Sequence, residues 1–221
     1  MHLIEVRHIT KFYQRGDETV HAVNDISFSV SAGEWIAIVG ESGSGKSTLM
    51  NILGCLDTPT SGEYLLDGEN TSTFNQARLA EIRNRKIGFI FQGFNLIPNL
   101  TAFENVELPL IYRGIKKEER QRLSREALNR VGLASRMDHK PAQMSGGQQQ
   151  RVAVARAIAA SPPIILADEP TGNLDPQSSK MIIDILKQLN ADGKTVLLIT
   201  HDLSIAQNAA RKIQIQNGVI L

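Results

Sequence analysis

Short apolar runs, bounded by glycine, proline or polar residues, recur along the chain. Runs of this length that are rich in β-branched and aromatic residues are typical of strands. We therefore predict strands at 4–9, 22–30, 35–39, 64–66, 87–91, 164–167 and 196–200.

Helical periodicity fills most of the intervals between these runs. It predicts helices at 46–56, 76–85, 102–112, 117–131, 148–160, 178–189 and 203–210. Strands that alternate with helices indicate an α/β fold with a largely parallel central sheet. The first strand-like runs are joined by short loops, so we expect an antiparallel part near the N-terminus.

Between residues 94 and 160 the strand signal nearly vanishes and several helices follow one another. This stretch is typical of an inserted helical subdomain. In its charged segment at 116–131, Leu123, Ala127 and Val131 recur at helical spacing. We expect these three to form a narrow buried stripe and the charged residues to form a solvated face.

Composition places the chain among ordinary globular proteins. With 221 residues, 42% hydrophobic and 21% charged, it suits one compact unit and not a disordered chain or a disulfide scaffold. Lys and Arg total 24 against 23 for Asp and Glu, so no overall charge draws it to nucleic acid or to an anionic membrane. The single cysteine, Cys55, excludes an intrachain disulfide. No run is long enough to span a bilayer, and the charged, alternating N-terminus lacks the pattern of an export signal.

The segment GESGSGKS at 40–47 stands between a predicted strand and a predicted helix. This is the setting of a phosphate-binding P-loop, whose glycines let successive backbone N–H groups point at phosphate oxygens. Lys46 would add a full positive charge and the Ser47 hydroxyl would ligate magnesium. A glycine-rich turn that matches by chance is the alternative, and the strand and helix flanks make it rare.

Two carboxylates, Asp168 and Glu169, end the strand predicted at 164–167. A parallel strand would deliver both near the phosphates, where Asp168 could hold magnesium and Glu169 could polarise the attacking water. His201 ends the next strand and could bind a γ-phosphate. Alone, the two acids would indicate a solvated strand-end turn and His201 a helix-start or loop histidine, so these roles depend on the P-loop.

A second anion-binding helix start is predicted at Ser145, Gly146 and Gly147, ahead of a helix that begins near Gln148. Small residues expose backbone N–H groups, and the dipole of the following helix favours phosphate. Such a segment alone would usually be only a loop and a helix cap. Beside a P-loop it raises the question of why one chain should carry two anion sites.

The order of these motifs resembles that of the ATP-binding subunit of ABC transporters, over essentially the whole chain. GESGSGKS is similar to the Walker A loop, FQGF at 91–94 to the Q-loop, MSGGQ at 144–148 to the signature and IILADE at 164–169 to Walker B. Residues 173–175 resemble the D-loop, and 200–202 the switch-histidine motif. Met144 replaces the usual leucine with a side chain of similar volume.

The resemblance implies a fold and its boundaries. We expect one ABC ATPase domain over 1–221, with a P-loop NTPase (RecA-like) core, an antiparallel β subdomain and an inserted α-helical subdomain. Residues 1–93 and 161–221 would form the nucleotide-binding core with the β subdomain. Residues 94–160 would form the helical subdomain that carries the signature.

The resemblance also implies a homodimer, in which two copies dimerise head to tail and each ATP lies between one Walker A loop and the other copy's signature. ATP and Mg²⁺ are the implied cofactors. Expected ATP-binding residues are Tyr13, which would stack on adenine, Gly40, Glu41, Ser42, Gly43, Ser44, Gly45, Lys46, Ser47 and Thr48, with Ser145, Gly146, Gly147 and Gln148 acting across the interface. Expected catalytic residues are Glu169, His201, Gln92 and Lys46, and expected metal ligands are Ser47, Gln92 and Asp168. Asp175 would communicate across the dimer, while Tyr13 could instead simply pack on the sheet.

Within the family the chain looks most like the group that contains MacB, LolD and FtsE, on the segments at 51–62, 87–110 and 145–157. That group implies an ATP-hydrolysing motor that drives an integral membrane permease subunit from the cytoplasmic face of the membrane. We expect residues 94–110 to help receive the permease's coupling helix. We also expect either a separate subunit or a piece of a longer chain. The transported substrate is not predicted.

Three other classes fit the sequence less well. A DNA-maintenance ATPase would place long coiled coils or zinc modules between Walker A and signature, for which the interval from Lys46 to Ser145 has no room, and the near-neutral charge predicts no nucleic-acid partner. A GTPase would carry an NKxD motif, which the sequence lacks. A scaffold without activity would have no need of Glu169 and His201.

Overall fold

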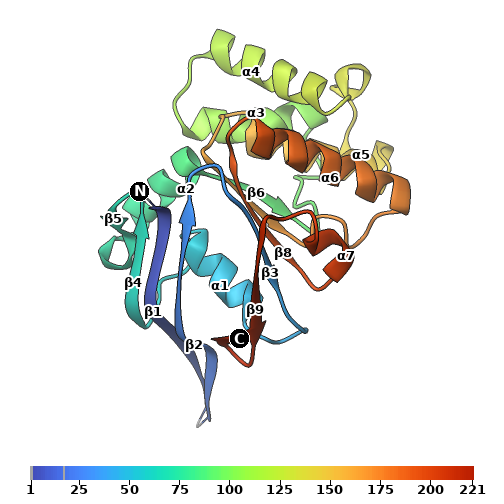
Figure 1. The fold of residues 1–221 in the computed structure, drawn as a ribbon. Helices are drawn as coiled ribbons and strands as arrows, with labels where there is room; N and C mark the ends of the chain where they lie inside the picture. The colour runs from blue at the N-terminus through green and yellow to red at the C-terminus, as the bar shows by residue number, and fades with distance from the viewer. Residues whose placement is uncertain (1, 17) are drawn as a thin grey trace.

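The computed structural model describes residues 2–16 and 18–221, which form two sheets (Figure 1). The larger has six strands in the order β10-β9-β3-β8-β7-β6. Its parallel strands are β3 (Trp35–Val39), β6 (Ile87–Phe91), β7 (Ile164–Asp168), β8 (Thr195–Thr200) and β9 (Arg211–Gln216), and β10 (Val219–Ile220) is antiparallel to β9. The predicted parallel central sheet is therefore confirmed.

The smaller sheet has four antiparallel strands in the order β2-β1-β4-β5. Its strands are β1 (His2–Arg15), β2 (Glu18–Ser31), β4 (Ser61–Leu66) and β5 (Glu69–Asn70). This confirms the predicted antiparallel part. β1 is longer than its apolar stretch, because backbone pairing with β2 continues through polar positions such as Gln14 opposite Thr19.

Helix α1 (Lys46–Leu53) lies between the two sheets, so the P-loop that precedes it is held from both sides (Figure 1). Its apolar residues Leu49 and Ile52 are fully buried, in one cluster with Ile4 of β1 and Ile38 of β3. The removal of these side chains from water fixes the helix against both sheets.

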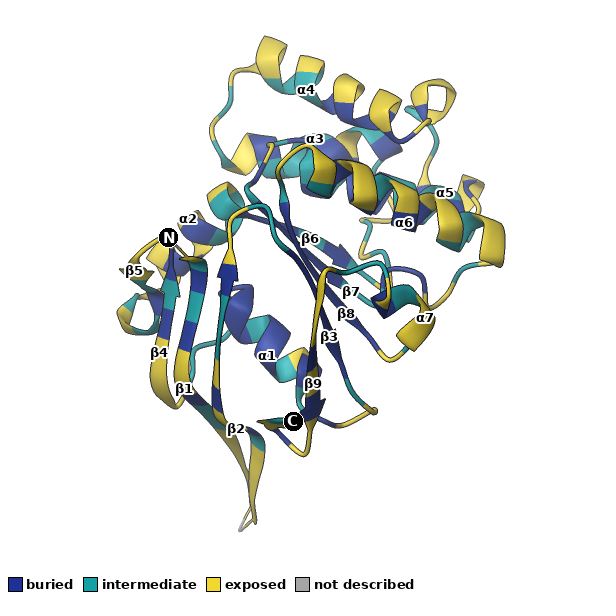
Figure 2. Ribbon diagram, viewed as in Figure 1, coloured by how far each residue is buried: buried dark blue, intermediate teal, exposed yellow. Residues whose placement is uncertain are grey.

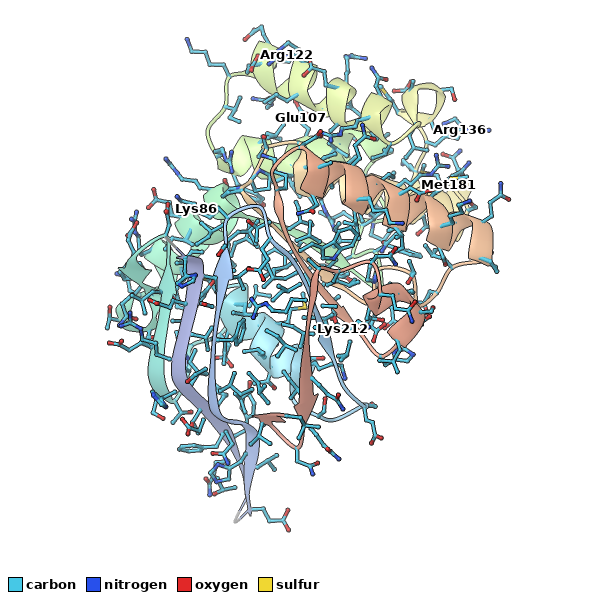
Figure 3. All side chains as sticks on the ribbon, viewed as in Figure 1. Lys86, Glu107, Arg122, Arg136, Met181 and Lys212 are labelled. Carbon is cyan, nitrogen blue, oxygen red and sulfur yellow. The ribbon has the colours of Figure 1, made fainter. Side chains whose placement is uncertain are left out.

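The remaining helices are α2 (Gln76–Lys86), α3 (Ala102–Tyr112), α4 (Lys117–Arg130), α5 (Gly146–Ile158), α6 (Pro176–Ala191) and α7 (Leu203–Ala206). Helices α3, α4 and α5 pack on one another at one end of the molecule, where α4 turns an exposed face outward (Figure 2). The predicted stripe of α4 is confirmed, since Ala127 and Val131 are buried and Leu123 packs against the same cluster. Charged α4 side chains such as Arg122 project from the surface (Figure 3).

Helix ends differ from the predicted ends where polar caps decide them. Helices α5 and α6 begin two residues earlier than predicted, because Ser145 and Asp175 accept hydrogen bonds from the N–H groups of Gln148 and Ser178. Helix α7 is shorter than the predicted helix at 203–210, because the chain turns after Ala206 to enter β9. Among the described residues, no helix has the length and apolarity needed to cross a membrane.

Candidate functional site

A cavity of about 790 Å³ opens where the carboxyl ends of β3, β7 and β8 meet, the edge at which parallel α/β sheets bind ligands. It brings together candidate residues from four distant segments of the sequence. Its lining consists of Val39, Gly40, Glu41, Ser42, Gly43, Lys46, Ser47, Gln92, Asp168, Glu169, His201, Leu203, Gln214, Ile215 and Gln216.

Two glycines of the loop are required by close backbone approach. A Cβ on Gly40 would lie 2.2 Å from the carbonyl oxygen of Ile215. Gly45 has φ +102°, and a Cβ there would lie 2.1 Å from the carbonyl oxygen of Ala22. Neither position has room for a side chain. Glycine at both positions therefore allows the loop to follow its curled path into the N-terminus of α1.

The Lys46 ammonium is folded over this loop. It donates to the carbonyl oxygens of Gly40 at 2.8 Å and of Glu41 at 2.6 Å, and only 8% of the residue is exposed. A full positive charge therefore lies beside the backbone N–H groups at the start of α1, where the helix dipole also favours an anion.

Glu169 and His201 form a close pair at the cavity. Glu169 Oε1 accepts a hydrogen bond from the backbone N–H of His201 at 2.8 Å and lies 2.6 Å from its Nδ1. Glu169 Oε2 accepts from the Thr200 hydroxyl at 3.1 Å. Glu169 itself has φ +43°, a left-handed conformation that is strained for a non-glycine residue. The two strand ends thus hold one carboxylate in a fixed orientation.

Asp168, the neighbour of Glu169, is partly buried. Burial raises the pKa of its carboxyl, the negative charge of Glu169 raises it further, and Lys46 opposes both. Asp168, the Ser47 hydroxyl and the Gln92 amide all line the cavity, and oxygens of these three kinds are the donors that Mg²⁺ prefers. Within the described part of the chain no group of three or more His, Cys, Asp and Glu side chains is placed to hold a metal ion.

Gln92 is held by Asn173, in the segment that follows Glu169. Gln92 Nε2 donates to Asn173 Oδ1 at 3.3 Å, and Asn173 Nδ2 donates to the backbone oxygen of Gln92 at 3.3 Å. This connection could not be predicted, because a hydrogen bond between distant loops leaves no local pattern in the sequence.

Five lining residues were not predicted, namely Val39, Leu203, Gln214, Ile215 and Gln216. The last three lie on β9, which was also missed. Its signal was present in the alternation of RKIQIQ at 211–216, where Ile213 and Ile215 are buried and their neighbours are exposed.

Tyr13 lies outside the cavity lining, on β1 near α1. Its hydroxyl donates to Asp57 Oδ2 at 2.9 Å, and the Lys11 ammonium lies 5.0 Å from the centre of its ring. Burial and the Asp57 carboxylate raise the pKa of Tyr13, against a hydrogen bond with Thr48 that lowers it. The cavity lining also leaves out three residues of the loop and of the first turn of α1, namely Ser44, Gly45 and Thr48.

The predicted signature lies away from this cavity, at the start of α5. Ser145 and Gln148 cap the helix reciprocally, with Ser145 N donating to Gln148 Oε1 at 3.0 Å. Gly147 packs against α6 so closely that a Cβ would lie 2.3 Å from Ser178 Oγ. Hydrogen bonds from the Ser178 side chain and backbone lower the pKa of Asp175, the cap of α6. The chain therefore presents two glycine-rich helix starts at separate places.

A second cavity, of about 390 Å³, lies among α2, β6, α3 and α5. It is lined by Leu56, Arg83, Asn84, Ile87, Gly88, Phe89, Phe91, Asn95, Pro109, Arg156, Ala157, Ala160 and Pro162. The Arg156 guanidinium donates to the backbone oxygen of Phe94 at 2.9 Å, and burial lowers its pKa. Strand β6 thus ends between the two cavities, with Phe91 facing one and Gln92 the other.

The family model described as "ABC transporter" matches residues 23–172. An ABC transporter ATP-binding protein of Thermotoga maritima is 50% identical over 99% of this chain and 93% of its own length. The macrolide export ATP-binding/permease protein MacB of Brucella melitensis is 52% identical over 99% of this chain, which corresponds to 34% of that protein.

Solved structures show the same likeness. The ATP-binding cassette MJ0796, in a dimeric post-hydrolysis state bound to ADP and Pi, superposes with a TM-score of 0.92 at 47% identity. The match covers 98% of this chain and 96% of that one. A dimeric structure of the same cassette, described as a bacterial ABC transporter cassette, also gives a TM-score of 0.92, at 48% identity.

Proposed function

This chain belongs to the ABC transporter family, as its motifs predicted. We therefore propose that it is the ATP-hydrolysing motor of a MacB/LolD-like transporter and that its predicted site residues bind and hydrolyse ATP. The observation that carries the proposal is the cavity that gathers Lys46, Asp168, Glu169 and His201 at one sheet edge. Separate sets of residues account for ATP binding, ATP hydrolysis and dimerisation.

The phosphates of ATP bind in the loop formed by Gly40, Glu41, Ser42, Gly43, Ser44, Gly45, Lys46, Ser47 and Thr48. Lys46 exchanges its two backbone acceptors for phosphate oxygens, whose negative charge attracts the ammonium more strongly than a carbonyl dipole does. Tyr13, oriented through its hydroxyl by Asp57, stacks on adenine beside this loop.

The donor set around the cavity fits Mg²⁺, with the Ser47 hydroxyl and the Asp168 carboxylate as ligands and the Gln92 amide as a further oxygen. A bound ion of this kind neutralises charge on the phosphates during transfer. Asp168 is suited to a cation because burial and the charge of Glu169 destabilise its ionised form when it has no counter-charge.

Glu169 polarises the attacking water and His201 contacts the γ-phosphate. The pair is already oriented, since the backbone and ring of His201 and the hydroxyl of Thr200 hold the carboxylate. An oriented base of this kind contributes about 10²–10⁴-fold to a rate. Gln92, directly after β6, contacts the ion or the attacking water and so senses closure of the site.

Two copies enclose ATP head to tail, and the solved cassette structures that this chain resembles are likewise dimeric. Ser145, Gly146, Gly147 and Gln148 of one copy then face the loop of the other. This arrangement explains the separation of the two glycine-rich helix starts within one chain, because each supplies half of a different site. Asp175, beside the signature, communicates between the copies.

The membrane part is a permease of the kind that MacB relatives carry in the same polypeptide. Residues 94–110 and the second cavity, at the junction of α3 and β6, receive its coupling segment. The chain thus works at the cytoplasmic face of the membrane, with residues 94–160 as a helical subdomain and residues 1–93 and 161–221 as the nucleotide-binding core.

The variant Glu169→Gln tests the hydrolytic role. It keeps the shape and most hydrogen bonds of the carboxylate but cannot polarise water, so turnover at saturating ATP should fall by about 10²-fold or more while ATP still binds. With ATP and Mg²⁺, light scattering after gel filtration should show a stable dimer that ADP does not support. Glu63→Gln, at an exposed position of β4, is the control and should hydrolyse ATP normally.

Unchanged turnover in Glu169→Gln would refute the role of this residue. If that variant instead stays monomeric with ATP although fluorescent mant-ATP binds it, the head-to-tail dimer is wrong. The two readouts therefore separate chemistry from assembly.

A further inference from the structure

The side chain of Gln150 is fully buried in the second turn of α5, just after the signature. Its amide nitrogen, Nε2, donates to the backbone oxygen of Pro170 at 2.6 Å and to that of Phe91 at 3.3 Å. One side chain therefore joins α5 to two loops that come from different strands.

Each of these acceptors adjoins a residue of the proposed catalytic centre. Pro170 follows Glu169, and Phe91 precedes Gln92. Gln92 and Asn173 also hold each other, so the segments after β6 and β7 form one bonded unit. Gln150 attaches that unit to the helix whose N-terminus carries Ser145.

The amide of Gln150 is unusual in being only half satisfied. Its oxygen, Oε1, has no hydrogen-bond partner among the residues that the structure describes. The two carbonyl groups fix which end of the amide is the nitrogen, because a carbonyl oxygen only accepts. A buried acceptor without a donor destabilises a fold, whereas an apolar side chain of the same length would fill the space without this cost. The two bonds made by Nε2 are therefore the reason for an amide here.

We propose that Gln150 is a positioning residue that couples the two ATP sites of the dimer. The inference rests on the proposed function, in which the signature of one copy faces the ATP held by the other. When the partner's ATP binds Ser145–Gln148, it fixes the N-terminus of α5. Because α5 is a rigid helix, the position of Gln150 is then fixed as well. Through its two hydrogen bonds, Gln150 then positions Glu169 and Gln92 of its own chain. Hydrolysis at one site therefore depends on ATP at the other.

The test compares two neighbouring glutamines in the full chain. Gln150→Met keeps the length of the side chain and removes both bonds. Gln149→Met is the matched control, because Gln149 Nε2 also donates to two backbone oxygens, those of Pro141 and Met144, both at 3.1 Å, but both lie within the helical region. The readouts are the dissociation constant for mant-ATP, the kcat per chain that binds mant-ATP, and the Hill coefficient for ATP.

For Gln150→Met we expect unchanged mant-ATP affinity, a kcat reduced by about tenfold and a Hill coefficient that falls from above 1 toward 1. The control should keep the kcat and Hill coefficient of the wild type. Because kcat is counted per binding-competent chain and all variants are compared at the same concentration of chains that bind mant-ATP, a partly unfolded variant still gives an answer.

A Hill coefficient in Gln150→Met equal to that of a cooperative wild type overturns the inference, even if kcat falls, since the residue would then only support packing. A wild type with a Hill coefficient of 1 overturns it as well. Failure of the wild type to hydrolyse ATP would instead refute the proposed function itself, so the two failures are distinguishable.

Discussion

Asp168 shows how one residue can be unfavourable for the fold and suited to the site. Its carboxyl pKa is raised by burial and by Glu169, so the ionised form destabilises the protein at neutral pH. Below the ordinary pKa of an aspartate the group is protonated in folded and unfolded chains alike, and the effect vanishes. Functional sites often retain groups of this kind at the expense of stability.

Asp168→Asn should therefore raise the melting temperature at pH 7 by a few degrees while abolishing ATP hydrolysis. The gain in melting temperature should shrink as pH falls through the folded-state pKa of Asp168. It should disappear near pH 3, where residue 168 is neutral in both the wild type and the variant. Calorimetry without nucleotide across this range measures it. Asp175→Asn is the control, because hydrogen bonds lower the pKa of Asp175 and no gain is expected there. A melting temperature at pH 7 below that of the wild type would contradict the description of Asp168.

Residues of this site differ in how far the sequence could reveal them. Lys46, Asp168, Glu169 and His201 each stand at a strand end or in a fixed motif, and the structure places them around one cavity. Gln150 could not be predicted, because its partners Phe91 and Pro170 are brought to it only by tertiary packing.

At the scale of elements, the loop before α3 is built around one buried amide. Asn105 is 1% exposed, and its Oδ1 accepts from the N–H of Ile97 at 2.8 Å. Its Nδ2 donates to the backbone oxygens of Ile97, Leu100 and Thr101. This one side chain thus replaces the regular backbone pairing that residues 97–101 lack, in the segment proposed to meet the permease.

Asn105→Leu should lower the free energy of unfolding by about 2–3 kcal/mol, because the N–H of Ile97 and the carbonyl oxygen of Leu100 lose their side-chain partner, and the oxygens of Ile97 and Thr101 keep only their backbone donors. Hydrogen exchange at the amides of 97–101 should accelerate, as measured by mass spectrometry. Asn190→Leu, which removes amide bonds to Gly33 and Lys194 at another loop, should destabilise the protein without that local change. Equal exchange at 97–101 in both variants would show that Asn105 does not organise the loop.

Periodicity predicted the long elements and missed those that tertiary contacts create. Strands β3, β6, β7 and β8 were predicted within one residue at either end, because their continuous apolar runs reflect burial on both faces. The two-residue strands β5 and β10 exist only through pairing with longer neighbours, β4 and β9, so no local pattern could reveal them.

At the scale of the whole molecule, the two glycine-rich helix starts lie on different parts of one chain. Helix α1 lies between the sheets, whereas α5 packs with α3 and α4 (Figure 1). In the proposed function, a signature outside its own phosphate cavity completes the site of a second copy, and a head-to-tail pair completes both sites.

Mixing two inactive variants tests this composite site most directly. Lys46→Ala removes the charge of one half-site and Ser145→Arg blocks the other, so each variant alone should be nearly inactive. In a mixed dimer, both defects fall in one site and leave the second intact. An equimolar mixture, in which about half of the dimers are mixed and each has one working site, should recover up to about a quarter of the wild-type ATPase rate. A mixture no more active than its separate components would contradict the head-to-tail account.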